Sequence, residues 1–189
     1  MLGTKRLLAT SGLAVGLLSV AVPGRVHAVP AAPVQGMVTA VSSGDTVTVT
    51  LADQRQVSVR LRDIDAPESC QPWGEESRAA LSTLALNKVA TLQASGRDGQ
   101  GRAVGNLMLD DLNVSRFLVE NGHAWSVRTR WDQGPLVKQE KMARALTRGL
   151  HATPGAVQPK EFRRLQGRCP EGSAAAPAPA ATTPPAKKK

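Results

Sequence analysis

The segment from Thr46 to Glu68, TVTVTLADQRQVSVRLRDIDAPE, decides how this chain of 189 residues folds. Apolar and polar residues alternate from Thr46 to Leu51 and again from Gln56 to Leu61. This period of two is typical of β-strands with one buried face. The residues Ala52–Arg55 between the runs predict a turn, and Met37–Val41 shows the same alternation upstream. The sequence therefore predicts a meander of three strands.

The chain beyond this meander is expected to form helices and two further strands. Apolar residues recur at helical spacing in three segments, and two short alternating runs follow the first of them. The expected helices are Glu75–Asn87, Val114–Asn121 and Pro135–Arg148, and the expected strands are Val89–Ala94 and Ala103–Leu109. Five short strands are too few for a sandwich but suffice for a small Greek-key barrel of the oligonucleotide-binding type. The predicted fold class is α+β, mainly β, with this five-stranded barrel and about three helices.

Both ends of the chain differ in composition from the predicted barrel domain, which covers residues 37–171. Residues 1–28 contain two early basic residues, an apolar run and small residues before Ala28, a pattern that predicts a cleaved signal peptide. An uncleaved membrane anchor is the alternative, although the run is short for a membrane span. Residues 29–36 are interpreted as a linker. Residues 172–189 are Ala/Pro-rich and end in three lysines, which predicts a disordered tail, either passive or a tether to anionic polymers.

The net charge of the whole chain overstates the charge of this domain. Its 24 Lys and Arg residues exceed the 15 Asp and Glu residues by nine. Three basic residues lie in the predicted signal peptide and three are the terminal lysines, so the body carries a net charge of about +3. Charge alone therefore does not establish a nucleic-acid partner.

The chain has two cysteines, Cys70 and Cys169, and its leader predicts export. Oxidising compartments favour disulfides, so we expect these two residues to be bonded. In the chain-entropy description, closing a loop of about 100 residues stabilises the folded state by about 4 to 5 kcal/mol. Free thiols or a metal site are the alternatives, although two cysteines without nearby histidines have poor spacing for zinc. The bridge would attach the C-terminal segment close to Glu68.

Charged residues gather where the predicted strands end. Alternation turns Arg60 away from the buried face of its strand, and Asp65 and Glu68 follow in the next loop. Asp45 and Arg102 stand at the starts of two other strands. Since strand ends of a small barrel meet around one hollow, we expect these five side chains to lie close together.

This combination of charges indicates a chemistry. Carboxylates crowded into one hollow repel each other unless a cation lies between them. Arginines bind phosphate oxygens through paired donors. Carboxylates for a hard metal together with arginines for an anion suit phosphodiester hydrolysis. Ordinary surface ion pairs and loop caps remain the alternative explanation of the same residues.

Five segments in the same order resemble the staphylococcal nuclease (thermonuclease) family. The resemblance covers about Met37–Arg164. The segments are SGDTVTV at Ser43–Val49, VRLRDIDAPE at Val59–Glu68, WGEES at Trp73–Ser77, GQGRAVG at Gly99–Gly105 and NVSRFLVENGHAW at Asn113–Trp125. One such motif is weak evidence, whereas five collinear motifs are highly specific.

The resemblance implies a calcium-dependent endonuclease that cuts DNA and RNA with little sequence preference and leaves 3′-phosphate ends. By motif position, the Ca²⁺ ligands would be Asp45, Asp65 and the backbone carbonyl of Ala66, with water and substrate completing the shell. Glu68 would be the general base for the attacking water. The two site arginines, Arg60 and Arg102, would stabilise charge on the phosphoryl oxygens.

Departures from the family pattern concern substrate binding. Ser43 stands where the family often has another aspartate, and the chain has no tyrosine, whereas the family's reference member holds the nucleotide with tyrosines. Gln100 stands at one of those positions. Near the other, Arg128 and Arg130 are candidates for phosphate binding and Trp131 for base stacking, with solvated charge as the alternative for the arginines.

The sequence therefore predicts an exported nuclease, periplasmic or extracellular, with a nucleic-acid substrate. It implies no stable protein partner and no transmembrane span after signal cleavage, and it is compatible with a monomer. Two other functions use the same features. One is a barrel that binds nucleic acid without cutting it, and the other is an envelope-associated protein organised by its basic tail.

Overall fold

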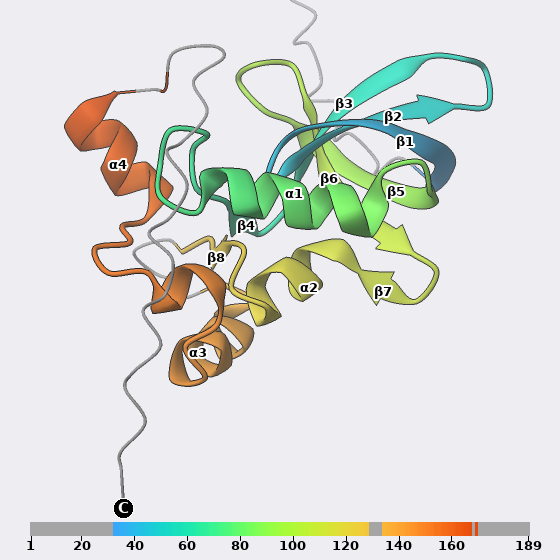
Figure 1. The fold of residues 1–189 in the computed structure, drawn as a ribbon. Coiled ribbons are helices and arrows are strands. Elements are labelled where there is room, and N and C mark those ends of the chain that lie inside the picture. Colours follow the sequence, from blue (N-terminus) through green and yellow to red (C-terminus); the bar gives the residue numbers. More distant parts are fainter. Residues whose placement is uncertain (1–31, 129–133, 168, 170–189) are drawn as a thin grey trace, which may run out of the picture.

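The computed structural model describes residues 32–128, 134–167 and 169 (Figure 1). Its strands are β1 Val34–Ser43, β2 Thr46–Leu51, β3 Gln56–Leu61, β4 Ile64–Asp65, β5 Val89–Arg97, β6 Ala103–Leu109, β7 Leu112–Asn113 and β8 Trp125–Ser126. Its helices are α1 Gly74–Ala85, α2 Val114–Glu120, α3 Val137–Ala145 and α4 Pro159–Gln166, with a 3₁₀ turn, η1, at Gly149–Ala152. The predicted signal peptide and tail lie outside the described residues.

Five long strands close into a barrel, which confirms the predicted fold class. Their order is β3-β2-β1-β5-β6, and β3 also pairs with β6 in parallel, from Val59 opposite Ala103 to Leu61 opposite Gly105. β1 pairs with β2 over most of its length and with β5 through its first residues. Two irregularities in the β1–β2 register let β1 curve between these neighbours. The register of β3 therefore places its carboxyl end beside the start of β6.

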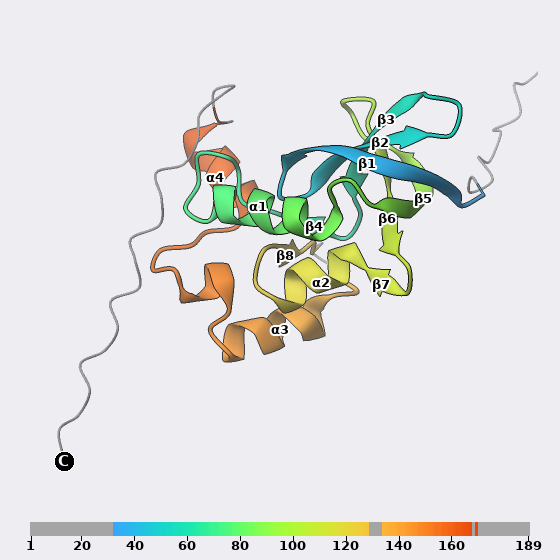
Figure 2. The same ribbon diagram turned by 45° about the vertical axis from the view of Figure 1, so that its right-hand side comes forward.

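The barrel core forms from the alternation seen in the sequence. Val47, Val49, Val59 and Leu61 are fully or almost fully buried, and the residues between them face outward or line the barrel end. α1 and α2 cover the barrel with buried leucines such as Leu81 and Leu118, while α3 lies outside α2 (Figures 1 and 2). The apolar faces of strands and helices thus share one core.

The helices follow the prediction in three cases and add a fourth. Asn113 caps α2, because its side chain accepts a hydrogen bond from the backbone N–H of Arg116 at 2.9 Å. α4 was not among the predicted helices. It begins at Pro159 and has only eight residues, of which Pro159 and Phe162 are buried, so its apolar face is too short to predict a helix from the sequence. Both ribbon views place α4 beside the beginning of α1 (Figures 1 and 2).

The structure also bears on three other expectations. A disulfide joins Cys70 to Cys169, which confirms the predicted bridge. β1 begins at Val34, inside the segment interpreted as a linker. Among the described helices, none is long and apolar enough to cross a membrane.

Candidate active site

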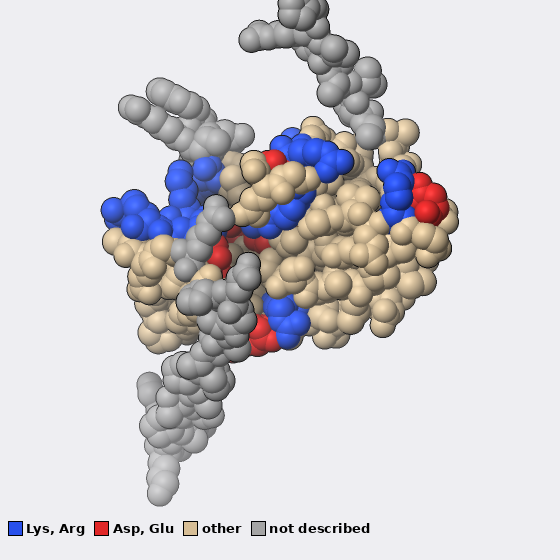
Figure 3. All heavy atoms as spheres, turned by 90° about the horizontal axis from the view of Figure 1, so that it is seen from above, with Lys and Arg blue, Asp and Glu red and all other residues tan. Residues whose placement is uncertain are grey.

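A wide, open cavity of about 830 Å³ lies at the end of the barrel where β1 turns into β2, β3 ends and β6 begins. Its walls come from these turns, from the loop after β4 and from α4. The charged residues that line it are Asp45, Arg60, Arg62, Asp63, Glu68, Asp98, Arg102 and Arg163. On this face, basic side chains gather over α4 and over the β5–β6 hairpin, with carboxylates between them (Figure 3).

Asp45 is the most deeply buried charged residue of the cavity, only 3% exposed. It follows Gly44, where a Cβ atom would lie 2.6 Å from the Cβ of Ser77 in α1, so glycine allows this turn to pack closely. Its Oδ1 accepts hydrogen bonds from the hydroxyls of Ser43 and Thr46, both at 3.0 Å. Its Oδ2 accepts the backbone N–H of Ala66 at 2.9 Å. These neutral donors hold the carboxylate in one orientation.

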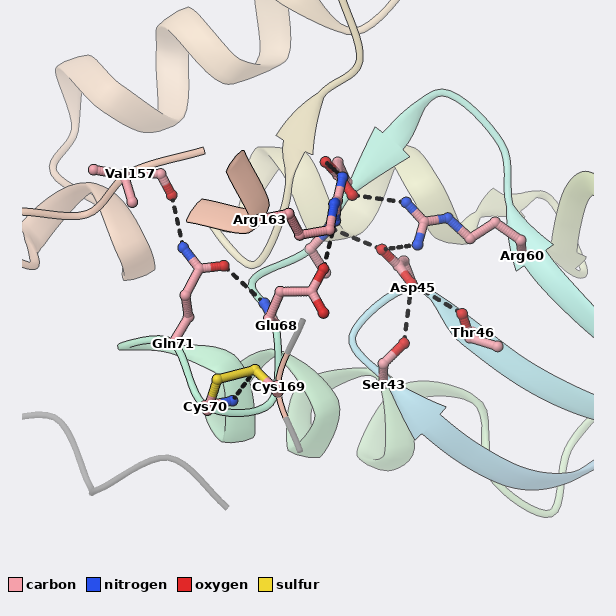
Figure 4. A network of polar contacts seen from close by, with 12 residues as sticks. Ser43, Asp45, Thr46, Arg60, Glu68, Cys70, Gln71, Val157, Arg163 and Cys169 are labelled. Atoms are coloured by element: carbon pink, nitrogen blue, oxygen red, sulfur yellow. Dashed lines mark hydrogen bonds and ion pairs between the residues drawn. A yellow bond between two sulfur atoms is a disulfide. The ribbon is translucent and has the colours of Figure 1, made fainter. Parts of the chain in front are cut away.

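Arg60 joins the two carboxylates that were predicted as metal ligands (Figure 4). Its Nη1 lies 2.8 Å from Oδ2 of Asp45, and its Nη2 lies 2.7 Å from Oδ1 of Asp65. The side chain points to the barrel end because Val59 and Leu61, its neighbours in β3, occupy the core. One guanidinium thus compensates two charges that would otherwise repel each other.

Glu68 lies in the loop between β4 and α1, where Gln71 holds its backbone N–H through Oε1 at 2.9 Å. Its Oε1 accepts a hydrogen bond from Nη1 of Arg163 in α4. The other amino group of Arg163 lies 3.1 Å from Oδ2 of Asp65. Within the described part of the chain, Oε2 of Glu68 has no hydrogen-bond partner. This oxygen is therefore available to a water molecule.

Arg102 reaches the cavity from the start of β6, and Asp98 braces it. Nε of Arg102 donates to Oδ2 of Asp98 at 2.7 Å, and its Nη1 donates to the hydroxyl of Thr46 at 3.2 Å. Burial raises the pKa of Asp98. Hydrogen bonds from the Arg102 side chain and from the backbone N–H groups of Gln100 and Arg102 lower it by more than burial raises it, so the pKa lies below its usual value. Thr46 therefore links Arg102 to Asp45.

The oxygen donors of the site suit a hard divalent cation. Asp45 and Asp65 lie close enough to pair with the same guanidinium, and Asp45 also accepts a hydrogen bond from the backbone N–H of Ala66. In the described residues, no group of three or more His, Cys, Asp or Glu side chains is arranged to hold a metal ion. A cation here would depend on two carboxylates, the Ala66 carbonyl and oxygens from water or substrate. Arg60 and Arg163 would have to give up part of their contacts with Asp65.

The residues predicted for substrate binding do not come together in the same way. Gln100 lines the cavity, and its backbone N–H donates to Asp98 at 2.9 Å. Arg128 instead pairs with Glu140, a fully buried carboxylate that also accepts Nη2 of Arg144 at 2.8 Å. The pairing of Glu140 with Arg144 follows from their i,i+4 spacing on α3, whereas no local spacing connects Glu140 to Arg128. Arg130 and Trp131 lie outside the described residues.

Two residues contact the site although the sequence did not predict that they would. Thr46 reads as one of several strand threonines, and Arg163 reads as part of a basic C-terminal run. Arg163 lies 95 residues beyond Glu68 and 98 beyond Asp65, so no local spacing connects them. The predicted disulfide was the available signal, since it placed the C-terminal segment next to the Glu68 loop.

Comparisons with known proteins relate this geometry to a family. Residues 58–153 match the family described as Staphylococcal nuclease homologue. A protein named probable staphylococcal-like nuclease CAN2, from Oryza sativa subsp. japonica, is 37% identical over 112 residues, which make up 59% of this chain and 30% of that protein. The chain therefore spans less than a third of this plant relative.

Bacterial relatives are covered over more of their length. An uncharacterized endonuclease of Haemophilus influenzae is 31% identical over 127 residues, 67% of this chain and 71% of its own length. An uncharacterized endonuclease of Escherichia coli O157:H7 is 34% identical over 134 residues, 70% of this chain and 86% of its own length. The family match includes Arg60, Glu68 and Arg102, begins after Asp45 and ends before Arg163.

Proposed function

Because this chain belongs to the staphylococcal nuclease family, we propose that it is an endonuclease that hydrolyses phosphodiester bonds of DNA and RNA. One observation carries the proposal. Arg60 bridges Asp45 and Asp65 at the edge of an open cavity that Glu68 and Arg102 also line. Acidic groups beside two arginines in one hollow meet the needs of a reaction on a phosphodiester anion.

The proposed cofactor is Ca²⁺, held by Asp45, Asp65 and the Ala66 carbonyl, with water and a substrate phosphate oxygen as further ligands. Calcium accepts six to eight oxygens in flexible geometry, which suits a site with few protein ligands. When bound, such a cation neutralises charge on the phosphate and polarises its oxygens. Ser43 and Thr46 support this role indirectly, because their hydroxyls hold the carboxylate of Asp45 in place.

The protein residues have separate roles in the proposed reaction. Glu68 accepts a proton from the attacking water through Oε2, which has no partner among the described residues, and the water oxygen forms a bond to phosphorus. The bond from phosphorus to the 5′ oxygen breaks, and its electron pair goes to that oxygen, which takes a proton from solvent water. Glu68 then returns its proton to solvent, and the product carries a 3′-phosphate. Arg60 and Arg102 donate hydrogen bonds to the phosphoryl oxygens as their charge grows. Arg60 therefore changes partners, from carboxylate to phosphate, during the cycle.

Low sequence preference is part of the proposal. The cavity is open and its polar lining comes mainly from charged groups suited to a phosphate backbone, which has the same chemistry in every sequence. Gln100 takes a place on the cavity wall where a hydrogen-bonding side chain can reach a nucleotide. Arg130 and Trp131 remain candidates for binding the strand beyond the cavity.

We further propose that the protein is exported to the periplasm or the cell exterior. The leader composition of residues 1–28 and a disulfide that closes a loop across 99 residues both support an oxidising destination. Detection of the mature form beginning at Val29 in the periplasm or culture medium would test this. Retention of the uncleaved chain in the cytoplasm would contradict it.

The decisive experiment measures cleavage of single-stranded DNA and of RNA by the protein from Val29 onward, with Ca²⁺ and with a chelator, beside Glu68→Gln. Glutamine keeps the size of the side chain but removes its basicity, so we expect a loss of about 100- to 10,000-fold in kcat. Glu161→Gln is the matched control, because this α4 carboxylate pairs only with Arg164 among the described residues. Nucleic-acid binding without any cleavage by the unmodified protein would instead support a non-catalytic binding barrel.

A further inference from the structure

We propose that Arg163 is a positioning residue of the active site, and that a C-terminal segment outside the family match holds it there. This inference rests on the proposed nuclease function and extends it to α4. We call Val157–Gly167 together with Cys169 the C-terminal clasp. The family match ends at residue 153, so the whole clasp lies beyond it.

The clasp contacts the active-site loop through three different interactions (Figure 4). Nε2 of Gln71 donates to the carbonyl of Val157 at 3.0 Å, while its Oε1 holds the backbone of Glu68. Gln71 is 1% exposed, so this bridge is protected from water. Cys70 is bonded to Cys169 at the other end of the clasp. Both ends of the clasp are therefore fastened within three residues of Glu68.

The third interaction is made by Arg163, in the middle of the clasp. Its two amino groups contact Glu68 and Asp65 separately, and the side chain is about one third exposed in the wall of the cavity. Its neighbour Phe162 is buried, which fixes the rotation of α4 and turns Arg163 toward the carboxylates. Arg163 thus contacts the proposed base and a proposed cation ligand at the same time.

The choice of oxygens indicates positioning rather than blocking. Arg163 engages Oε1 of Glu68 and leaves Oε2 without a partner among the described residues. A carboxylate held by one oxygen presents the other in a defined direction, which lowers the cost of orienting an attacking water. On Asp65, Arg163 takes Oδ2 while Arg60 takes Oδ1. Both carboxylates are thus oriented by guanidinium groups before a cation or substrate arrives.

The test compares three single variants for DNA cleavage under saturating and limiting substrate. Arg163→Ala should lower kcat by about 10- to 100-fold with little change in KM, because it loosens the base without removing a substrate contact. Arg163→Lys should recover part of the loss, since the ammonium keeps the charge but lacks the planar fork of donors with which arginine reaches both carboxylates. Arg164→Ala is the matched control on the next residue of α4, exposed and paired with Glu161, and should leave activity unchanged.

A second set of variants tests whether the disulfide acts by holding Arg163 in place. Cys70→Ser/Cys169→Ser should lower kcat in the unmodified background but cause little further loss in the Arg163→Ala background, because both changes remove the same restraint. Thermal unfolding of each variant shows whether it remains folded at the assay temperature. If the fold-losses in kcat from the cysteine changes and from Arg163→Ala multiply when the changes are combined, the two act independently. That result would overturn the role of the disulfide in holding Arg163.

A readout independent of cleavage separates this inference from the proposed function. Side-chain carboxyl ¹³C resonances of Glu68 and Asp65 should both move in Arg163→Ala and stay in place in Arg164→Ala. Unmoved resonances, or a loss in Arg163→Ala that lies only in KM, would overturn the positioning role. Failure of the unmodified protein to cut any nucleic acid while the resonances still respond would overturn the nuclease proposal and leave the contact of Arg163 with both carboxylates supported.

Discussion

Arg60 and Asp45 form an ion pair of 2.8 Å at the end of the barrel, between the start of β2 and the end of β3. The pairing of Thr46 with Arg60 across these strands sets their distance. Asp45 is almost fully buried, and its carboxylate oxygens also accept hydrogen bonds from two hydroxyls and one backbone N–H. Folding thus assembles part of the proposed cation site before any cation or substrate binds.

Asp45→Asn should therefore affect both stability and activity. The amide keeps the shape of the side chain but removes the charge that compensates Arg60, and we expect about 1 to 3 kcal/mol less stability in urea unfolding. Ca²⁺-dependent cleavage should fall as well. Asp53→Asn is the control, since Asp53 lies in the exposed β2–β3 turn and pairs only with Arg55 among the described residues. Equal stability losses in the two variants would contradict a special role for Asp45.

Arg102→Ala should reduce activity mainly through kcat. Its guanidinium lies at the cavity wall and is braced by Asp98, so it can meet charge that develops on the phosphoryl oxygens without first being ordered. We expect a loss of about 100- to 1,000-fold in kcat, measured by steady-state cleavage of a short DNA. Arg97→Ala, on the same hairpin but outside the cavity lining, is the control. A pure rise in KM would mean that Arg102 only binds substrate.

The strands show how far sequence reasoning can reach. β2, β3 and β6 were predicted to the residue, because each has one face in the core and therefore alternates clearly. β1 and β5 extend further than predicted. Most of their extra residues, such as Val34 and Arg97, are exposed and join the sheet through backbone pairing. Hydrogen bonding between strands leaves no pattern in side-chain polarity, so these ends could not be predicted.

The same distinction applies to the site. Arg60 could be assigned to the barrel end because alternation in its own strand excludes it from the core. The contact of Arg163 with Glu68 could not be predicted, because it depends on how a short, mostly polar helix docks about 95 residues later in the chain. For Arg128, the sequence predicted either phosphate binding or a solvated charge. Its ion pair with buried Glu140 could not be predicted, because no local pattern reveals how Glu140 docks.

His123 should make stability depend on pH. Burial lowers its pKa below the usual value, and its Nδ1 accepts a hydrogen bond from the Trp73 indole at 3.4 Å, which requires the neutral form. The unfolded chain therefore binds a proton at higher pH than the folded one. The stability contributed by neutral His123 is complete above its unfolded pKa of about 6.5 and is lost as pH falls toward the folded value.

Urea unfolding at a series of pH values from about 7.5 to 5 checks this, since a carboxylate with a lowered pKa, such as Asp98, titrates below this range. His123→Gln keeps a hydrogen-bond acceptor but does not titrate, so its stability should fall less over the same range. His151, whose pKa is lowered first by burial and also by Arg144, contributes in the same direction. His123→Gln/His151→Gln should therefore have the flattest profile. An unchanged slope in both variants would show that neither histidine is responsible for the acid sensitivity.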